Sequence, residues 1–116
     1  MTKPPVNVHQ HYHAHVYYDE STSGFAKDLC TEVGNRFALE VGRFHDKSIG
    51  PHPMWSCQIK FNSSEFETLV PWLEENRKEL TVLIHGLTGN DFLDHTEYAY
   101  WLGEEKVLNT EIFKNT

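Results

Sequence analysis

The sequence predicts an α+β fold in which two helices cover one face of a small antiparallel sheet. Three observations support this fold class. Four short segments are apolar or alternate between apolar and polar residues, as strands do. Two other segments repeat apolar residues at the period of a helix. The chain has 116 residues, enough for one domain with a core of its own.

The first strand is expected at residues 10–18, QHYHAHVYY, where residue types alternate strictly. Its odd positions carry His11, His13, His15 and Tyr17. Successive side chains of a strand point to opposite faces, so these four share one face. Residues 1–9 contain two prolines and no periodicity, and we expect them to be a loose lead-in to a domain at residues 10–116.

The first helix is expected to follow a turn rich in Ser and Thr, which can cap it. Its apolar residues recur at every fourth position: Phe25, Leu29, Val33 and Phe37. A short second strand is expected at residues 38–44. Residues 46–53, DKSIGPHP, are rich in turn formers and should form a loop.

The third strand shows one apolar face, formed by Trp55, Cys57, Ile59 and Phe61. In the second helix, Ser64 and Glu67 have the spacing of a capping box, and Pro71 either kinks the helix or marks a restart. The fourth strand is expected at residues 80–85, LTVLIH. Residues 86–104 should form a turn and then an irregular or short-strand tail rich in aromatic residues.

The order β-α-β-β-α-β is that of a ferredoxin-like fold, in which the first strand lies between the third and the fourth. Each strand should turn its apolar side toward the helices. The opposite face then collects the histidines of the first strand and His85 of the fourth, which we expect to be neighbours. Trp55 alternates with the core residues and should belong to the core.

Composition excludes several classes of function. The net charge is −7 and no basic stripe is present, which argues against nucleic-acid binding. No apolar run approaches the ~20 residues of a membrane span, and no secretory signal is seen, so we expect a cytoplasmic protein. Cys30 and Cys57 lack metal-site spacing and should be buried small hydrophobic residues.

The chain contains eight histidines, and their arrangement suggests a metal site. His13 and His15 are separated by ~6.6 Å of strand rise, so both imidazoles can converge on one ion. His85 is the first candidate for a third ligand, and His52 is the next. The carboxylate candidates are Glu97 and Asp91. The alternative interpretation is that these histidines are solvated or pack against a partner subunit.

Three stretches carry a family resemblance: HAHVYYD at 13–19, GRFHDKSIGPHPMWSCQI at 42–59 and LIHGLTGNDFLDHTEYAYWLGE at 83–104. With them, the chain resembles the DOPA 4,5-dioxygenase family of small single-domain proteins. The resemblance implies extradiol opening of the catechol ring of 3,4-dihydroxyphenylalanine (DOPA) with O2. One departure is visible, because Gly86 follows His85 where relatives often have proline.

The resemblance implies a ferrous ion held by His13, His15 and His85, although imidazoles also accept zinc or manganese. His52 is the first candidate for the catalytic base and His95 the second. The predicted substrate-binding residues are Tyr17, which could stack on the ring, and Arg43, which could pair with a carboxylate. An open sheet face is incomplete as a pocket, so we expect a homodimer with residues 98–102 near the contact. The alternative function is a non-catalytic dimeric module that binds a transition metal or a small aromatic ligand.

Overall fold

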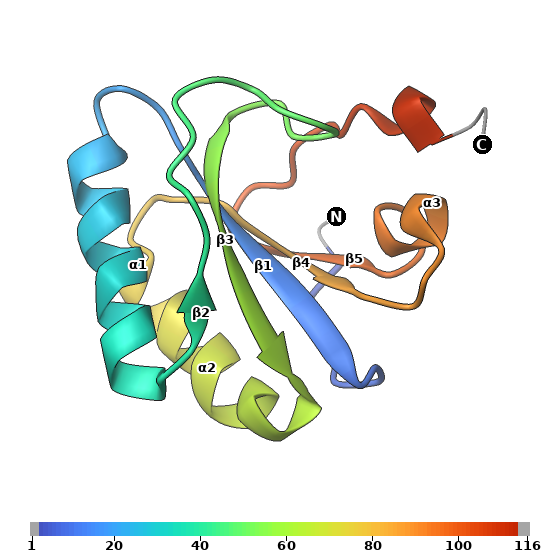
Figure 1. The fold of residues 1–116 in the computed structure, drawn as a ribbon, viewed down its shortest axis with the longest axis horizontal. Coiled ribbons are helices and arrows are strands. Elements are labelled where there is room, and N and C mark those ends of the chain that lie inside the picture. The colour runs from blue at the N-terminus through green and yellow to red at the C-terminus, as the bar shows by residue number, and fades with distance from the viewer. Residues whose placement is uncertain (1–2, 114–116) are drawn as a thin grey trace.

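The computed structural model describes residues 3–113 and shows a five-stranded antiparallel sheet in the order β2-β3-β1-β4-β5. In chain order the elements are β1 His11–Tyr18, α1 Ser23–Phe37, β2 Glu40–Val41, β3 Trp55–Asn62, α2 Ser63–Asn76, β4 Val82–Gly86, α3 Asp91–Asp94, β5 Ala99–Leu102 and the 3-10 helix η1 Thr110–Phe113. Helices α1 and α2 lie together on one side of the sheet (Figure 1). The predicted α+β fold and the central position of β1 are confirmed.

The main core lies between the sheet and helices α1 and α2. The even positions of β1 contribute Tyr12, Ala14, Val16 and Tyr18, all buried. Cys30 of α1 and Cys57 of β3 are fully buried free thiols, as predicted. Trp55 packs against the same cluster, which confirms its assignment to the core. With one face of β1 committed to the core, its odd positions are left for the opposite face.

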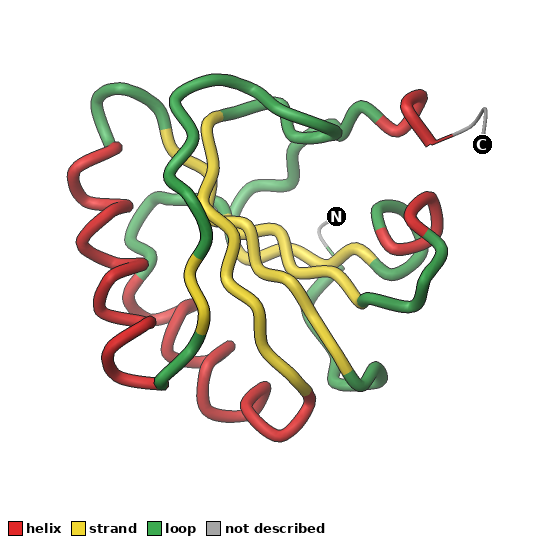
Figure 2. Tube along the Cα trace, viewed as in Figure 1, coloured by secondary structure: helices red, strands yellow, loops and turns green. Residues whose placement is uncertain are grey.

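The second strand is shorter than predicted, because β2 covers only Glu40–Val41 instead of residues 38–44. Ala38 ends α1 in the left-handed conformation, with φ 55°, so the chain reverses before it can pair. After β2, the nitrogen of Gly42 still donates to the oxygen of Gln58, but the segment then runs as a loop (Figure 2). This loop continues to the start of β3.

Helix α2 begins earlier than the sequence suggested. The capping box is formed by Asn62 and Glu65, not by Ser64 and Glu67. Asn62 has the extended backbone of an N-cap because it is also the last residue of β3, and its side chain accepts from the nitrogen of Ser64 at 3.0 Å. Pro71 lies inside α2, which continues to Asn76 as one helix.

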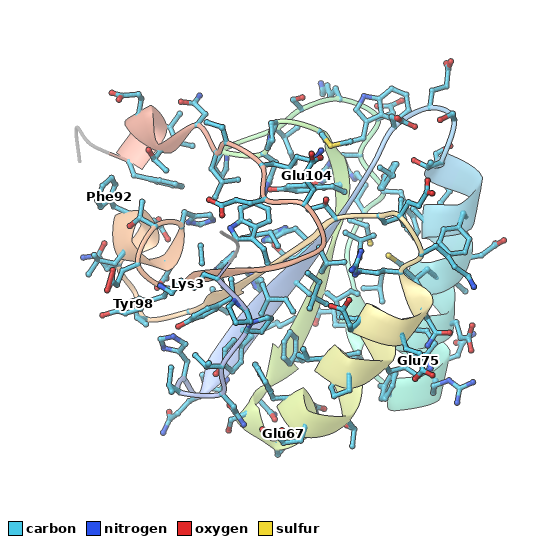
Figure 3. The ribbon with its side chains drawn as sticks, turned by 180° about the vertical axis from the view of Figure 1, so that it is seen from behind. Lys3, Glu67, Glu75, Phe92, Tyr98 and Glu104 are labelled. Atoms are coloured by element: carbon cyan, nitrogen blue, oxygen red, sulfur yellow. The ribbon has the colours of Figure 1, made fainter. Side chains whose placement is uncertain are left out.

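The tail after β4 forms the short helix α3 and then β5, which pairs with β4 at the sheet edge. Residues 3–9 of the predicted lead-in contact the sheet, whereas residues 1 and 2 of that prediction lie outside the described residues. The oxygen of Lys3 accepts from the nitrogen of Trp101 at 2.9 Å, and His9 Nε2 lies 3.0 Å from the hydroxyl of Tyr100. Lys3 lies on the same side of the molecule as Tyr98 (Figure 3). The segment therefore lines the outer edge of β5.

Among residues 3–113, no helix combines the length and the apolar character needed to cross a bilayer.

Candidate metal centre

Strands β1 and β4 bring three histidines together on the sheet face opposite α1 and α2. The antiparallel register places His13 directly opposite His85, and His15 is two residues further along β1. One ligand nitrogen from each of these three residues lies within 4.8 Å of the other two. The predicted juxtaposition of the β1 histidines with His85 is confirmed, and this set could hold a metal ion.

The spacing of the nitrogens fits a shared cation. Nε2 of His15 lies 3.0 Å from Nε2 of His85. Two imidazole nitrogens bound at ~2.1 Å would be separated by ~3.4 Å at a tetrahedral angle and by ~3.0 Å at a right angle. Nδ1 of His85 lies 2.9 Å from the oxygen of Gly86, and a carbonyl oxygen can only accept, so Nδ1 carries the proton. The lone pair on Nε2 of His85 is therefore available to bind a metal ion.

Burial keeps these imidazoles uncharged. It lowers the pKa of His85 to about 3 and that of His15 well below its ordinary value, with repulsion from neighbouring histidines adding to the effect. The pKa of half-buried His13 falls to about 4, first through burial and then through the nearby charge of Lys60. All three are therefore neutral near pH 7, which is the form that binds metals.

A fourth histidine, His52, reaches the site from the loop before β3. The centroid of its ring lies 4.1 Å from that of His15. Its Nδ1 is 2.8 Å from the hydroxyl of Tyr17, and both side chains are buried. Burial lowers the pKa of His52 to about 4 and raises that of Tyr17, so this pair is also uncharged. The hydroxyl of Tyr17 thus contacts His52, and the prediction that the ring of Tyr17 stacks on the substrate stays a prediction.

The fifth histidine, His95, directly follows α3. Its ring centroid lies 4.3 Å from that of His85 and 6.3 Å from that of His52. Nδ1 of His95 lies 2.8 Å from the oxygen of Asp91, and the ring of Phe113 stacks on the imidazole at 4.8 Å. We call the five residues the histidine cluster: His13, His15, His52, His85 and His95.

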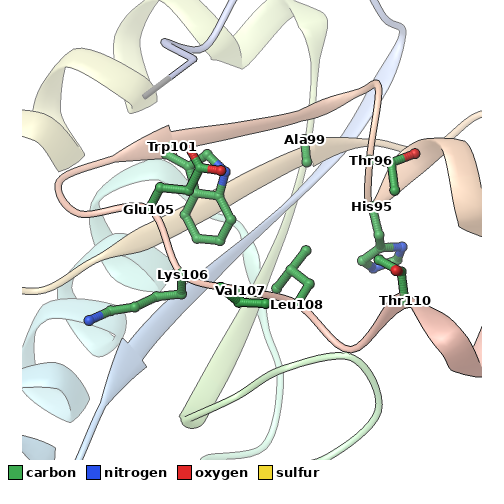
Figure 4. A pocket seen from close by; sticks show the side chains of 9 residues that line it. All are labelled: His95, Thr96, Ala99, Trp101, Glu105, Lys106, Val107, Leu108 and Thr110. Carbon is green, nitrogen blue, oxygen red and sulfur yellow. The ribbon is translucent and has the colours of Figure 1, made fainter. Parts of the chain in front are cut away.

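A cavity of about 600 Å³ adjoins the cluster at His95. Its walls include the indole of Trp101 and the side chain of Leu108, and Thr96 and Thr110 lie near His95 (Figure 4). The volume is typical of a site for a small molecule. Of the histidine cluster, His95 is the member that lines this cavity.

The sheet face that carries the cluster is not open, which corrects the prediction. His15 is 5% exposed and Tyr17 is 1% exposed within this single chain. Met54 and Leu108 pack over a second apolar cluster that contains Tyr17 and Trp101. The nitrogen of Asn109 donates to the oxygen of Pro51 at 2.9 Å and joins the two covering segments, 51–54 and 104–113.

These covering segments bear on the predicted homodimer. Residues 99–102 are already buried within one chain as β5. The sheet face that we expected to be open, and to be covered by a second copy, is therefore already covered by the chain itself. The homodimer itself stays a prediction.

Three other predicted residues contribute no side chain to the group that could hold a metal. Arg43 is exposed after β2 and does not line the cavity beside His95. Glu97 and Asp91 are also exposed, and across residues 3–113 the group that could hold a metal contains no carboxylate. His9, expected in a loose tail, packs its ring over Gly86, where an added Cβ would lie 2.7 Å from His9 Cδ2. Its contacts could not be read from sequence spacing.

Comparison with known proteins places these observations in a family. The Dopa 4,5-dioxygenase family model matches residues 12–112. An uncharacterised 21.2 kDa protein of Botryotinia fuckeliana is 30% identical, covering 89% of this chain and 63% of that protein. A DOPA 4,5-dioxygenase of Amanita muscaria is 29% identical, covering 84% of this chain and 47% of that protein. The chain thus spans roughly half to two thirds of these curated relatives.

A solved structure agrees with the family match. A crystal structure from Nostoc punctiforme, described provisionally as a dioxygenase, is 41% identical with a TM-score of 0.85. The match covers 88% of this chain and 89% of that one. The structural neighbour agrees with the family match, and the three histidines of this fold could hold a metal. The chain belongs to the Dopa 4,5-dioxygenase family.

Proposed function

We propose that this protein is a non-haem metal-dependent extradiol dioxygenase that opens the ring of a catechol such as DOPA with O2. One observation carries the proposal: three neutral imidazoles offer ligand nitrogens within 4.8 Å of one another, and His95, whose ring lies 4.3 Å from that of His85, lines a cavity large enough for a small aromatic molecule. The family and the dioxygenase neighbour support the reaction class.

The proposed ligands are His13, His15 and His85. Three protein ligands suit ferrous iron, because they leave positions for substrate and oxygen. When bound, the iron would supply the site at which catechol and O2 meet and exchange electrons. Zinc or manganese could occupy the same imidazoles in a purified sample.

The remaining groups of the site would bind the substrate and handle its protons. Trp101 offers an aromatic wall for the catechol ring within the cavity. His95 and His52 are the two members of the cluster outside the proposed ligand set, and an imidazole beside the bound catechol could take its hydroxyl proton. The covering segments 51–54 and 104–113 would limit the access of bulk water.

The test uses the purified full chain, stripped with chelator and reconstituted with Fe(II) without oxygen. Oxygen uptake and formation of a yellow product are then measured with DOPA, with tyrosine as the control that lacks the second hydroxyl. His15→Ala and His85→Ala should each weaken metal binding by about 100-fold or more and abolish oxygen uptake. His11→Ala is the matched control, because His11 is exposed on the same strand, outside the ligand set.

Two results would contradict the proposal. Metal or catechol binding without oxygen uptake would identify a binding module instead of an enzyme. Activity that survives His15→Ala and His85→Ala unchanged would show that the proposed ligands take no part in the reaction.

A separate test concerns Arg43 as the partner of the substrate carboxylate. If the guanidinium binds that carboxylate, Arg43→Gln should raise the KM for DOPA but not for unsubstituted catechol. A KM for DOPA equal to that of the wild type would dismiss this role.

A further inference from the structure

The pairing of Tyr17 with His52 distinguishes His52 from the other histidines of the cluster. Its Nδ1 faces a phenol hydroxyl at 2.8 Å, whereas Nδ1 of His85 and Nδ1 of His95 each face a backbone carbonyl oxygen. A carbonyl can only accept a hydrogen bond, but a hydroxyl can also donate one. The three rings therefore need not carry their protons on the same nitrogen.

We propose that Tyr17 is a positioning residue that holds His52 with its proton on Nε2, so that His52 serves the site as a hydrogen-bond donor and not as its base or a metal ligand. This inference deepens the proposed function, and its catalytic part depends on that function. The assignment of the proton position depends only on the hydrogen bonds of the chain.

The direction of the bond between Tyr17 and His52 follows from the number of available protons. The phenol carries one proton, and within residues 3–113 its hydroxyl has one hydrogen-bond partner, Nδ1 of His52. If Nδ1–H donated instead, the hydroxyl proton would be left without an acceptor at a side chain that is 1% exposed. Such a loss costs about 1–3 kcal/mol. The hydroxyl therefore donates and Nδ1 accepts. The ring proton is then on Nε2, which is not among the fully buried atoms left without a partner in residues 3–113, so a proton there costs less.

The same reasoning gives His95 the opposite arrangement. Its Nδ1 donates to the oxygen of Asp91, so in the neutral form of the ring Nε2 has no proton and can accept one. His95 also lines the cavity, whereas His52 does not. The proton acceptor for a substrate in the cavity is then His95, and the first candidate from the sequence, His52, has neither nitrogen available for that task.

The division of roles balances chemically. The proton of a catechol hydroxyl passes to Nε2 of His95, which leaves a catecholate and an imidazolium. No proton leaves His52. Its ring lies beside the proposed ligand His15, outside the cavity lined by His95, and its neutral N–H would donate a hydrogen bond to a negatively charged oxygen held on that side of the site. Such a donor stabilises charge more strongly when it is fixed before the reaction begins, and the bond from Tyr17 provides this fixation.

Nuclear magnetic resonance of the metal-free protein tests the proton positions without any enzyme assay. Two-bond 15N–1H spectra at pH 7.5 should show His52 with its proton on Nε2 and a hydrogen-bonded Nδ1. Tyr17→Phe should shift the His52 Nδ1 signal. The matched control is Tyr100→Phe, which removes a hydroxyl bonded to His9 and should leave His52 unchanged. A proton on Nδ1 of His52 in the wild type, or no shift in Tyr17→Phe, would overturn the inference.

Steady-state kinetics test the roles in the iron-loaded enzyme. His52→Gln keeps an N–H donor at a similar place and should retain activity within about tenfold, whereas His52→Leu and His95→Gln should lower kcat by about 100-fold or more. Tyr17→Phe should lower kcat while KM and zinc affinity stay within about twofold. In the His52→Leu background it should have no further effect. Equal loss in His52→Gln and His52→Leu would show that His52 is a base after all.

The two experiments separate this inference from the proposed function. If the protein consumes no oxygen with any catechol, the proposed function fails, yet the spectra still decide whether Tyr17 sets the proton position of His52. If the enzyme is active and the spectra show a proton on Nδ1, the inference fails and the dioxygenase assignment stands.

Discussion

Acidification should destabilise the metal-free protein, because its buried histidines are neutral in the fold and become charged when the chain unfolds. Burial lowers the pKa of His52 to about 4 and that of His85 to about 3. Both residues have an ordinary pKa of 6.5 when exposed. Between these values the unfolded chain binds more protons than the folded one, so the free energy of unfolding falls as the pH falls. Above about pH 7 it should be independent of these groups.

The size of this effect follows from proton linkage. At pH 5 an unfolded histidine gains about 2 kcal/mol from protonation, whereas folded His52 and His85 gain almost none, so this pair alone removes about 4 kcal/mol. His15, which is buried more deeply than His52, acts in the same direction. The loss is a sizeable fraction of a total stability of about 5–15 kcal/mol.

Urea unfolding followed by circular dichroism, in EDTA at pH 7.5, 6.5, 5.5 and 5.0, measures this loss. His52→Gln should reduce the pH dependence by about 2 kcal/mol between pH 7.5 and 5.0. His11→Gln is the control and should retain the wild-type pH dependence, because this side chain is exposed to solvent in both states. A free energy of unfolding that stays within about 1 kcal/mol across this range would refute the reasoning.

Three further predictions concern local structure and the metal. Asn62→Ala should lower the unfolding free energy by about 1 kcal/mol, because it removes the capping box, whereas Ser64→Ala should lower it by about half as much or less. The opposite order of the two effects would show that Ser64 is the N-cap, as the sequence predicted. Gly86→Ala should displace the ring of His9 and cost about 1 kcal/mol in urea titrations, whereas Gly24→Ala meets nothing within 4 Å and should not destabilise. Zinc at about 100 times its Kd should raise the unfolding free energy by about 2.7 kcal/mol, and EDTA should reverse this gain. If calorimetry shows no such stabilisation, the metal does not bind the folded protein.

The sequence could predict the pairing at the site because strand periodicity and topology together determine it. His13 and His15 fall on one face by alternation, and His85 ends the apolar run that forms the neighbouring strand. A shift of one residue would have moved the histidines into the core, where Ala14 and Val16 fit and imidazoles do not. The burial of one face therefore determined which residues gather on the other.

The features that the sequence could not predict depend on irregular backbone. His52 and Leu108 lie on segments without periodicity, so nothing in their spacing shows that they cover β1. The capping box was misplaced because Asn62 with Glu65 and Ser64 with Glu67 share the same spacing, and only the extended backbone at Asn62 distinguishes them. The position of His9 against Gly86 likewise depends on a tertiary contact.

The hydrogen bond between the nitrogen of Asn109 and the oxygen of Pro51 has a kinetic consequence. It joins two segments that are distant in sequence. One of them carries His52, whose ring lies 4.1 Å from that of His15, and His15 and His85 are only 5% and 2% exposed. An ion from solution would reach those nitrogens only while the segments are parted. The rate of metal uptake should then reach a plateau at high ion concentration, and this plateau should equal the rate at which the two segments separate. Removal of the ion by a chelator should not exceed the same rate of separation.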